Sequence, residues 1–162
     1  MRKALVLSIL LIVVCISASA QLPAIQLKDI DGKSMNMSEL NKKGHPVILS
    51  FFATWCKPCL RELSAINEVY ADWQEETGVE LIAVSIDQGQ DVAKVKPLVD
   101  GSAWDFNVLL DPGSDLKRAM GVNVIPHVFL LDGEGNIVSS HIGYTEGSDA
   151  VLFDEVKKLV NK

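Results

Sequence analysis

Two cysteines separated by a lysine and a proline are the residues best suited to chemistry in this chain of 162 residues. They stand in the segment FFATWCKPCL at positions 51–60, and the one further cysteine is Cys15. Cys56 and Cys59 are three positions apart, so on a helix they share a face, with Cβ atoms about 5–6 Å apart. That spacing lets a disulfide form and be released again.

Three other uses of this pair agree less well with the sequence. A structural disulfide closing so short a loop would constrain little of the unfolded chain. A tetrahedral zinc site needs four ligands, and the three histidines, His45, His127 and His141, form no second closely spaced pair. A peroxidatic cysteine would follow a threonine by three residues, whereas Thr54 lies two before Cys56. The pair is therefore predicted to be redox-active.

The residues around the pair predict a buried strand followed by an amphipathic helix. The run VILSFF at 47–52 is typical of a strand buried on both faces. Apolar residues then recur at three- and four-residue steps over 58–77, up to the helix-ending Gly78. Cys56 is thus expected at the helix N-terminus, where an anion is stabilised. It should be the attacking thiolate, and Cys59 the thiol that resolves the mixed disulfide.

The rest of the pattern predicts an α/β domain with a central mixed sheet flanked by helices. A second buried strand, a short strand and a closing hairpin follow the motif, and a smaller hairpin precedes it as an N-terminal extension. These segments lie at 79–86, 107–110, 128–142 and 22–37, and a terminal amphipathic helix is expected at 149–162.

The first twenty residues have the layout of a secretory signal peptide. A positive start is followed by an apolar run at 4–16 and by small residues that end at Ala20. The alternative is a retained membrane anchor, but 13 helical residues span only about 20 Å of a core of roughly 30 Å. We therefore expect cleavage after Ala20, a periplasmic domain of residues 21–162, and Cys15 as an apolar part of the leader. The net charge of −6 argues against nucleic acid as a partner.

The motif FFATWCKPC, followed far downstream by GVNVIPHVFLLDGEGNIV, resembles the TlpA/ResA-like branch of the thioredoxin family. The resemblance covers nearly all of residues 21–162 and implies a thioredoxin fold in an extracytoplasmic thiol–disulfide oxidoreductase. It also implies that Pro126 is the cis-proline opposite the cysteines, exposing the backbone of Ile125 to an extended partner segment. His127 departs from the usual threonine at its position, and its role stays open.

The same resemblance assigns further residues to the site. Trp55, Lys57 and Pro58 are expected to shape the surface that meets the partner protein. Thioredoxin carries a buried aspartate where this chain has Ser50, which cannot act as a base. Glu80, at the start of the run VELIAVSI, is instead predicted to accept the proton of Cys59; the alternative is that Glu80 faces water.

The sequence thus predicts an enzyme that exchanges its dithiol for disulfides in protein partners. We expect no cofactor, because the cysteines carry the electrons, and we expect a monomer. The resemblance favours a periplasmic reductant recharged by a membrane electron donor, with cytochrome c maturation as one possible destination. A disulfide-forming oxidant or isomerase and a thiol-dependent metal or haem chaperone are the alternatives, since direction depends on the reduction potential.

Overall fold

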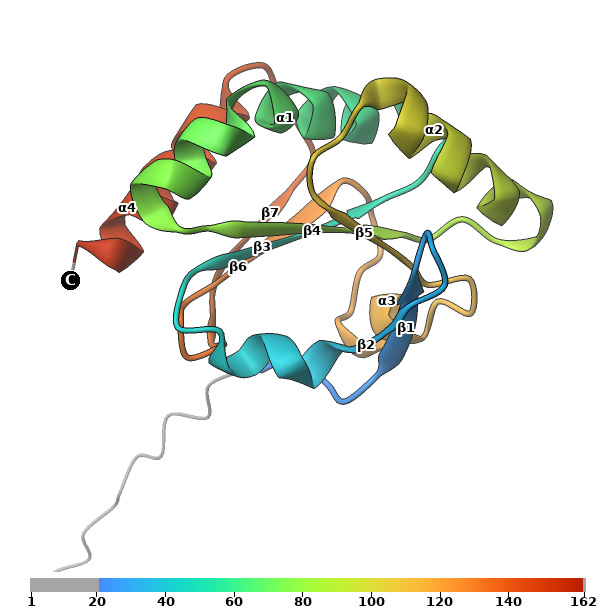
Figure 1. The fold of residues 1–162 in the computed structure, drawn as a ribbon, viewed down its shortest axis with the longest axis horizontal. Helices are drawn as coiled ribbons and strands as arrows, with labels where there is room; N and C mark the ends of the chain where they lie inside the picture. The colour runs from blue at the N-terminus through green and yellow to red at the C-terminus, as the bar shows by residue number, and fades with distance from the viewer. Residues whose placement is uncertain (1–20, 162) are drawn as a thin grey trace, which may run out of the picture.

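A mixed sheet of seven strands forms the centre of the computed structural model, which describes residues 21–161 (Figure 1). The expected leader, its cleavage point and Cys15 lie outside these residues. The strands follow the order β2-β1-β5-β4-β3-β6-β7. Their bounds are β1 Gln26–Asp29, β2 Ser34–Asn36, β3 Val47–Phe52, β4 Glu80–Ser85, β5 Asn107–Leu110, β6 His127–Leu131 and β7 Ile137–Ile142.

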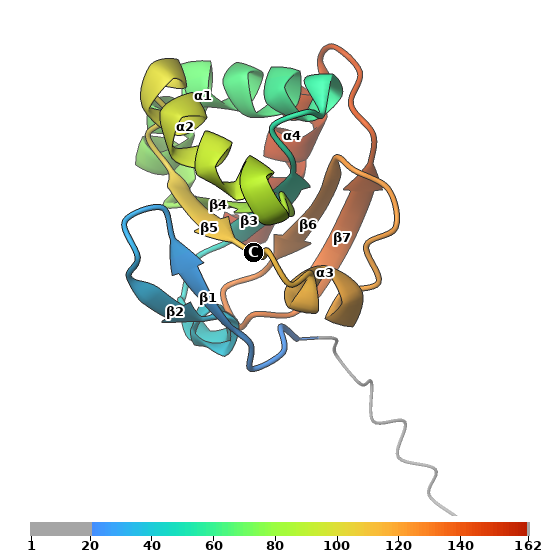
Figure 2. The same cartoon turned by 90° about the vertical axis from the view of Figure 1, so that its right-hand side faces the viewer.

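Helices cover both faces of the sheet (Figures 1 and 2). The helices α1, α2 and α4 lie on one face, and η1 and α3 lie on the other. Their bounds are η1 Met37–Lys42, α1 Lys57–Thr77, η2 Gly89–Lys94, α2 Val95–Ser102, α3 Asp115–Ala119 and α4 Ser148–Val160. Within residues 21–161, no helix combines the length and the apolar character needed to cross a bilayer.

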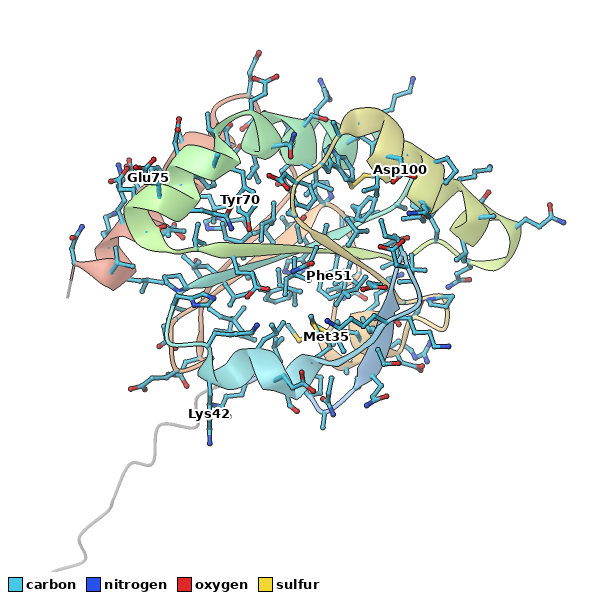
Figure 3. All side chains as sticks on the ribbon, viewed as in Figure 1. Met35, Lys42, Phe51, Tyr70, Glu75 and Asp100 are labelled. Atoms are coloured by element: carbon cyan, nitrogen blue, oxygen red, sulfur yellow. A yellow bond between two sulfur atoms is a disulfide. The ribbon has the colours of Figure 1, made fainter. Side chains whose placement is uncertain are left out.

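The strand β3 lies in the middle of the core, as its sequence predicts. All six of its residues are buried, and it pairs in parallel with β4 and antiparallel with β6. Successive side chains point to opposite faces, so Phe51 contacts Phe129 while Phe52 contacts Trp104. Figure 3 shows Phe51 and Tyr70 on opposite sides of the sheet. The predicted mixed sheet and its antiparallel N-terminal hairpin are both confirmed.

Helix α1 packs its apolar stripe against the sheet and against α4. Its buried residues include Leu63, Ile66 and Trp73, and the Trp73 ring stacks on Phe153 of α4 with centroids 4.5 Å apart. The helix ends at Gly78, whose φ of 69° is the left-handed conformation that glycine adopts without strain. This long, well-buried helix fixes the position of the two cysteines at its first turn.

Candidate active site

The two cysteines form a disulfide at the N-terminus of α1. Their Cα atoms are 5.3 Å apart. Cys56 is the N-cap residue, and its Sγ accepts a hydrogen bond of 3.3 Å from the Cys59 backbone N–H. Cys59 is fully buried, whereas Cys56 retains 5% exposure. Cys56 is therefore the more accessible of the two cysteines, and its assignment as the attacking thiolate stays a prediction.

The residues next to the two cysteines include a proline in the first helical turn and an exposed tryptophan ring. Pro58 lies in the first turn of α1, where its missing N–H costs no intrahelical bond. Lys57 is exposed, and the ring of Trp55 is 63% exposed beside the N-cap. The Trp55 ring therefore leaves a large aromatic surface available for contact beside the disulfide.

Pro126 lies at the same edge of the sheet as the disulfide. The register pairs Phe51 with His127, so the start of β6 lies opposite the end of β3, from which the motif continues. The Ile125–Pro126 peptide bond is cis, as expected, and the Pro126 carbonyl accepts a hydrogen bond of 2.8 Å from Gly143. The Ile125 side chain is half-buried against the core.

His127 does not face solvent. It is buried, stacked on Phe129 with centroids 4.2 Å apart, and neither ring nitrogen has a hydrogen-bond partner among the described residues. Burial lowers the pKa of this imidazole below its usual 6.5, so the ring is neutral at pH 7. It acts in the structure as an aromatic spacer at the start of β6.

The assignment of Glu80 as the proton acceptor needs correction. Glu80 pairs with Val47 at the far end of β4, five residues or about 17 Å along the strand from the edge that carries the cysteines. Its carboxylate is bound by Lys43 and His45, each at 3.3 Å, and by Asn107 at 3.3 Å. The sequence places Glu80 on the right strand, but at the wrong end of it.

Glu62 is the acidic residue that lies close to Cys59. It is one turn further along α1, at the three-residue spacing that puts two side chains on one face. It is only 5% exposed, and Ser50 Oγ donates a hydrogen bond of 3.1 Å to its carboxylate. Burial raises the pKa of Glu62 from 4.5 to about 7; the Ser50 bond lowers it and the charge of Asp149 adds to the rise.

The sequence indicates that Glu62 is buried, although its charge suggests an exposed position. Among charged positions of an amphipathic helix, Glu62 looks like part of the outer face. Its spacing from Cys59 and Ile66, however, is three and four residues, which places all three on the buried stripe. The position of a residue on the helix, and not its polarity, decides its burial here.

A pocket of about 680 Å³ connects Glu62 with the surface. Its apolar wall includes Ile66 and Val128, and its outer wall includes Tyr144 from the segment joining β7 to α4 and Asp149 from the first turn of α4. A buried carboxyl group that lines such a pocket can exchange its proton with water. Across residues 21–161, the histidine, cysteine and acidic side chains form no cluster of three or more suited to a metal ion.

Comparisons with known proteins agree with this geometry. Residues 18–140 match the AhpC/TSA family. A curated relative, the thiol-disulfide oxidoreductase ResA of Bacillus thuringiensis, is 38% identical over 121 residues, covering 75% of this chain and 67% of the relative.

Solved structures show the same fold. An uncharacterized thioredoxin-like protein from Porphyromonas gingivalis is 61% identical, with a TM-score of 0.77 over 88% of this chain and 94% of its own. StoA from Bacillus subtilis is 26% identical, with a TM-score of 0.64 over 82% and 99% of the two chains.

Proposed function

Because this chain belongs to the AhpC/TSA family of thioredoxin-like proteins and is a thiol-disulfide oxidoreductase of the ResA and StoA type, we propose that it reduces disulfides of partner proteins outside the cytoplasm. The observation that carries the proposal is the asymmetry of the two sulfurs. Cys56 is the partly accessible N-cap, and Cys59 is enclosed one turn behind it.

The exchange balances in two steps. The Cys56 thiolate attacks one sulfur of the partner's disulfide, forming a mixed disulfide and releasing the other partner sulfur as a thiolate. The Cys59 thiolate then attacks Cys56 Sγ, which re-forms the Cys56–Cys59 disulfide and releases the second partner thiolate. Two electrons pass to the partner, and the protein leaves oxidised.

The proton of Cys59 is the difficult part of the second step, because burial disfavours a thiolate. Glu62 is within one helical turn of Cys59, and a pKa of about 7 suits a group that must both accept and release a proton near neutral pH. We assign Glu62 the role of base for Cys59. The pocket beside it supplies the route by which the proton reaches water.

The proposed surface for the partner has two sides. One consists of Trp55, Lys57 and Pro58, and the other of Ile125 and Pro126. They come from the two segments that meet at the edge of the sheet carrying the disulfide. The exposed ring of Trp55 would cover the mixed disulfide, and the Ile125 backbone would pair with an extended partner strand.

The local charges favour a reductant. A strong oxidant stabilises its reduced form, chiefly through its thiolate. Here Glu62 is buried near the motif, where a negative charge opposes a thiolate, while the positive charge of Lys57 is exposed and screened by water and salt. The disulfide form is therefore favoured, and the dithiol gives up its electrons readily.

The equilibrium reduction potential of the Cys56–Cys59 pair tests this direction. We expect a value closer to the about −270 mV of thioredoxin than to the about −120 mV of a periplasmic oxidant. Equilibration with glutathione and dithiothreitol buffers, followed by alkylation and mass measurement, gives the value. A potential above about −180 mV would instead assign the protein as a disulfide-forming oxidant or isomerase.

The location rests on the leader pattern of residues 1–20. The full chain, expressed in a bacterium and recovered from the extracytoplasmic fraction, should have an intact mass that begins at Gln21. Retention of the first twenty residues, or a lipid attached to Cys15, would contradict the proposed cleavage. A membrane electron donor and a part in cytochrome c maturation would fit a monomeric reductant placed there.

A further inference from the structure

A second buried carboxylate, that of Asp87, lies just beyond the end of β4. Asp87 is 1% exposed, and three hydroxyl or amide groups donate to its two oxygens. Thr54 provides two of them, its backbone N–H to Oδ2 at 2.9 Å and its Oγ1 to Oδ1 at 2.7 Å. Ser85 Oγ provides the third, to Oδ2 at 2.8 Å. The Asp87 side chain thus accepts hydrogen bonds from both donors of Thr54, its backbone N–H and its hydroxyl group.

Thr54 belongs to the turn that leads into Cys56 and fixes its position. The Cys56 N–H donates to the Ala53 carbonyl at 3.0 Å, which closes a turn over residues 53–56. Thr54 is the second residue of this turn, and Cys56 is the last. Because Ile86 N–H also donates to the Phe52 carbonyl at 2.9 Å, the end of β4 provides a rigid base for the turn.

Asp111 at the end of β5 shows what an ordinary buried aspartate does in this fold. It is also 1% exposed, but it accepts backbone N–H groups from Asp115 and Lys117, both at 2.8 Å, and so closes the first turn of α3. Asp87 closes no helix. Its bonds to other segments all go to the turn before the cysteines.

We propose that Asp87, acting through Thr54, is a positioning residue for Cys56. In the oxidised protein the disulfide itself holds Cys56 against Cys59. When the disulfide opens that tie is lost, and the Asp87–Thr54 bonds keep the sulfur at the N-terminus of α1, where the Cys59 N–H points at it. The inference rests on the proposed role of Cys56 as the nucleophile.

Charge and position predict opposite results for Asp87→Asn, which makes the inference testable. A carboxylate acting only by its charge would oppose the thiolate, so its removal would make Cys56 ionise more readily. Asparagine cannot accept both Thr54 donors in the same way, because one of its terminal groups is itself a donor. Loss of position would therefore make Cys56 ionise less readily.

The experiment measures the alkylation rate of each cysteine in the reduced protein with iodoacetamide between pH 4 and 10. For Thr54→Val and Asp87→Asn we expect the pH midpoint of Cys56 to rise and its rate at neutral pH to fall at least about tenfold, as loss of one hydrogen bond to a charged group implies. Thr54→Ser, which keeps the hydroxyl, should restore the wild-type profile. A fall of the midpoint in Asp87→Asn, or no change in either variant, would overturn the inference.

Asp111→Asn is the matched control for general destabilisation. It removes an equally buried carboxylate at the end of the next strand and should lower resistance to urea without moving the Cys56 midpoint. An equal midpoint shift in Asp111→Asn would assign the effect to loosened folding and would overturn the positioning role. The wild-type profile tests the underlying function separately, because faster alkylation of Cys59 than of Cys56 would contradict the proposed nucleophile itself.

Discussion

Replacing Cys59 with serine is expected to leave the protein linked covalently to its partners through Cys56. The nucleophile at the start of α1 is retained, but nothing remains to attack the mixed disulfide from the buried side. Turnover of a disulfide substrate such as insulin should fall by at least about a thousandfold, as removal of a member of a catalytic unit does. Non-reducing electrophoresis with mass spectrometry of the trapped species gives the linked residue.

Cys56→Ser is the matched control, because it keeps the other cysteine in the same helix. It should lose turnover equally and trap almost nothing, since the Cys59 sulfur is fully enclosed. Equal trapping by both variants would show that the buried sulfur reaches partners as well as the accessible one. In that case the order of attack inferred from the helix would be incorrect.

The hydrophobic pattern of the sequence was sufficient to predict those parts of the site that depend only on residues close together in the chain. A six-residue apolar run had to be a buried strand, and a helix had to begin just after Cys56 for its apolar positions to face that strand. The end of that helix at Gly78 follows equally from local conformation. These features require no knowledge of which strands are neighbours.

The prediction for Glu80 is wrong because the pairing register of two strands distant in the sequence decides where this residue lies. Glu80 was placed on the correct strand, but only the pairing of Val47 with Glu80 shows which edge it occupies. Glu80 was judged by its residue type before its surroundings were known.

Glu62→Gln should separate catalysis from stability. Glutamine keeps the size of the side chain and can still accept a hydrogen bond from Ser50, but it cannot take up a proton from Cys59. We expect resolution of the mixed disulfide to slow by about a hundredfold at neutral pH, the scale at which a positioned base contributes. Stopped-flow tryptophan fluorescence of the reduced protein mixed with a disulfide peptide follows this step, and the wild-type rate should show an inflection near pH 7 that the variant lacks.

Glu80→Gln is the control for this substitution, because it makes the same chemical change at the far end of the sheet. It should leave the exchange rate within about twofold of wild type. The lost surface ion pair costs only about 0–1 kcal/mol of stability, and the substitution removes no proton acceptor from the neighbourhood of Cys59. A slow step in Glu80→Gln together with a normal rate in Glu62→Gln would restore the original assignment of Glu80.

The stability of Glu62→Gln should change in the opposite direction to its activity. The folded protein holds the Glu62 proton up to about pH 7, whereas the unfolded chain releases it near pH 4.5. The stability that this proton provides is complete below pH 4.5 and is lost as the pH rises through about 7. A glutamine has nothing to ionise, so the variant should exceed wild type in free energy of unfolding by a margin that grows over this window toward about 3 kcal/mol. Urea unfolding at pH 5 and pH 8 measures the margin; a difference that does not grow with pH would mean that Glu62 ionises freely and is no better placed than a surface carboxylate to serve Cys59.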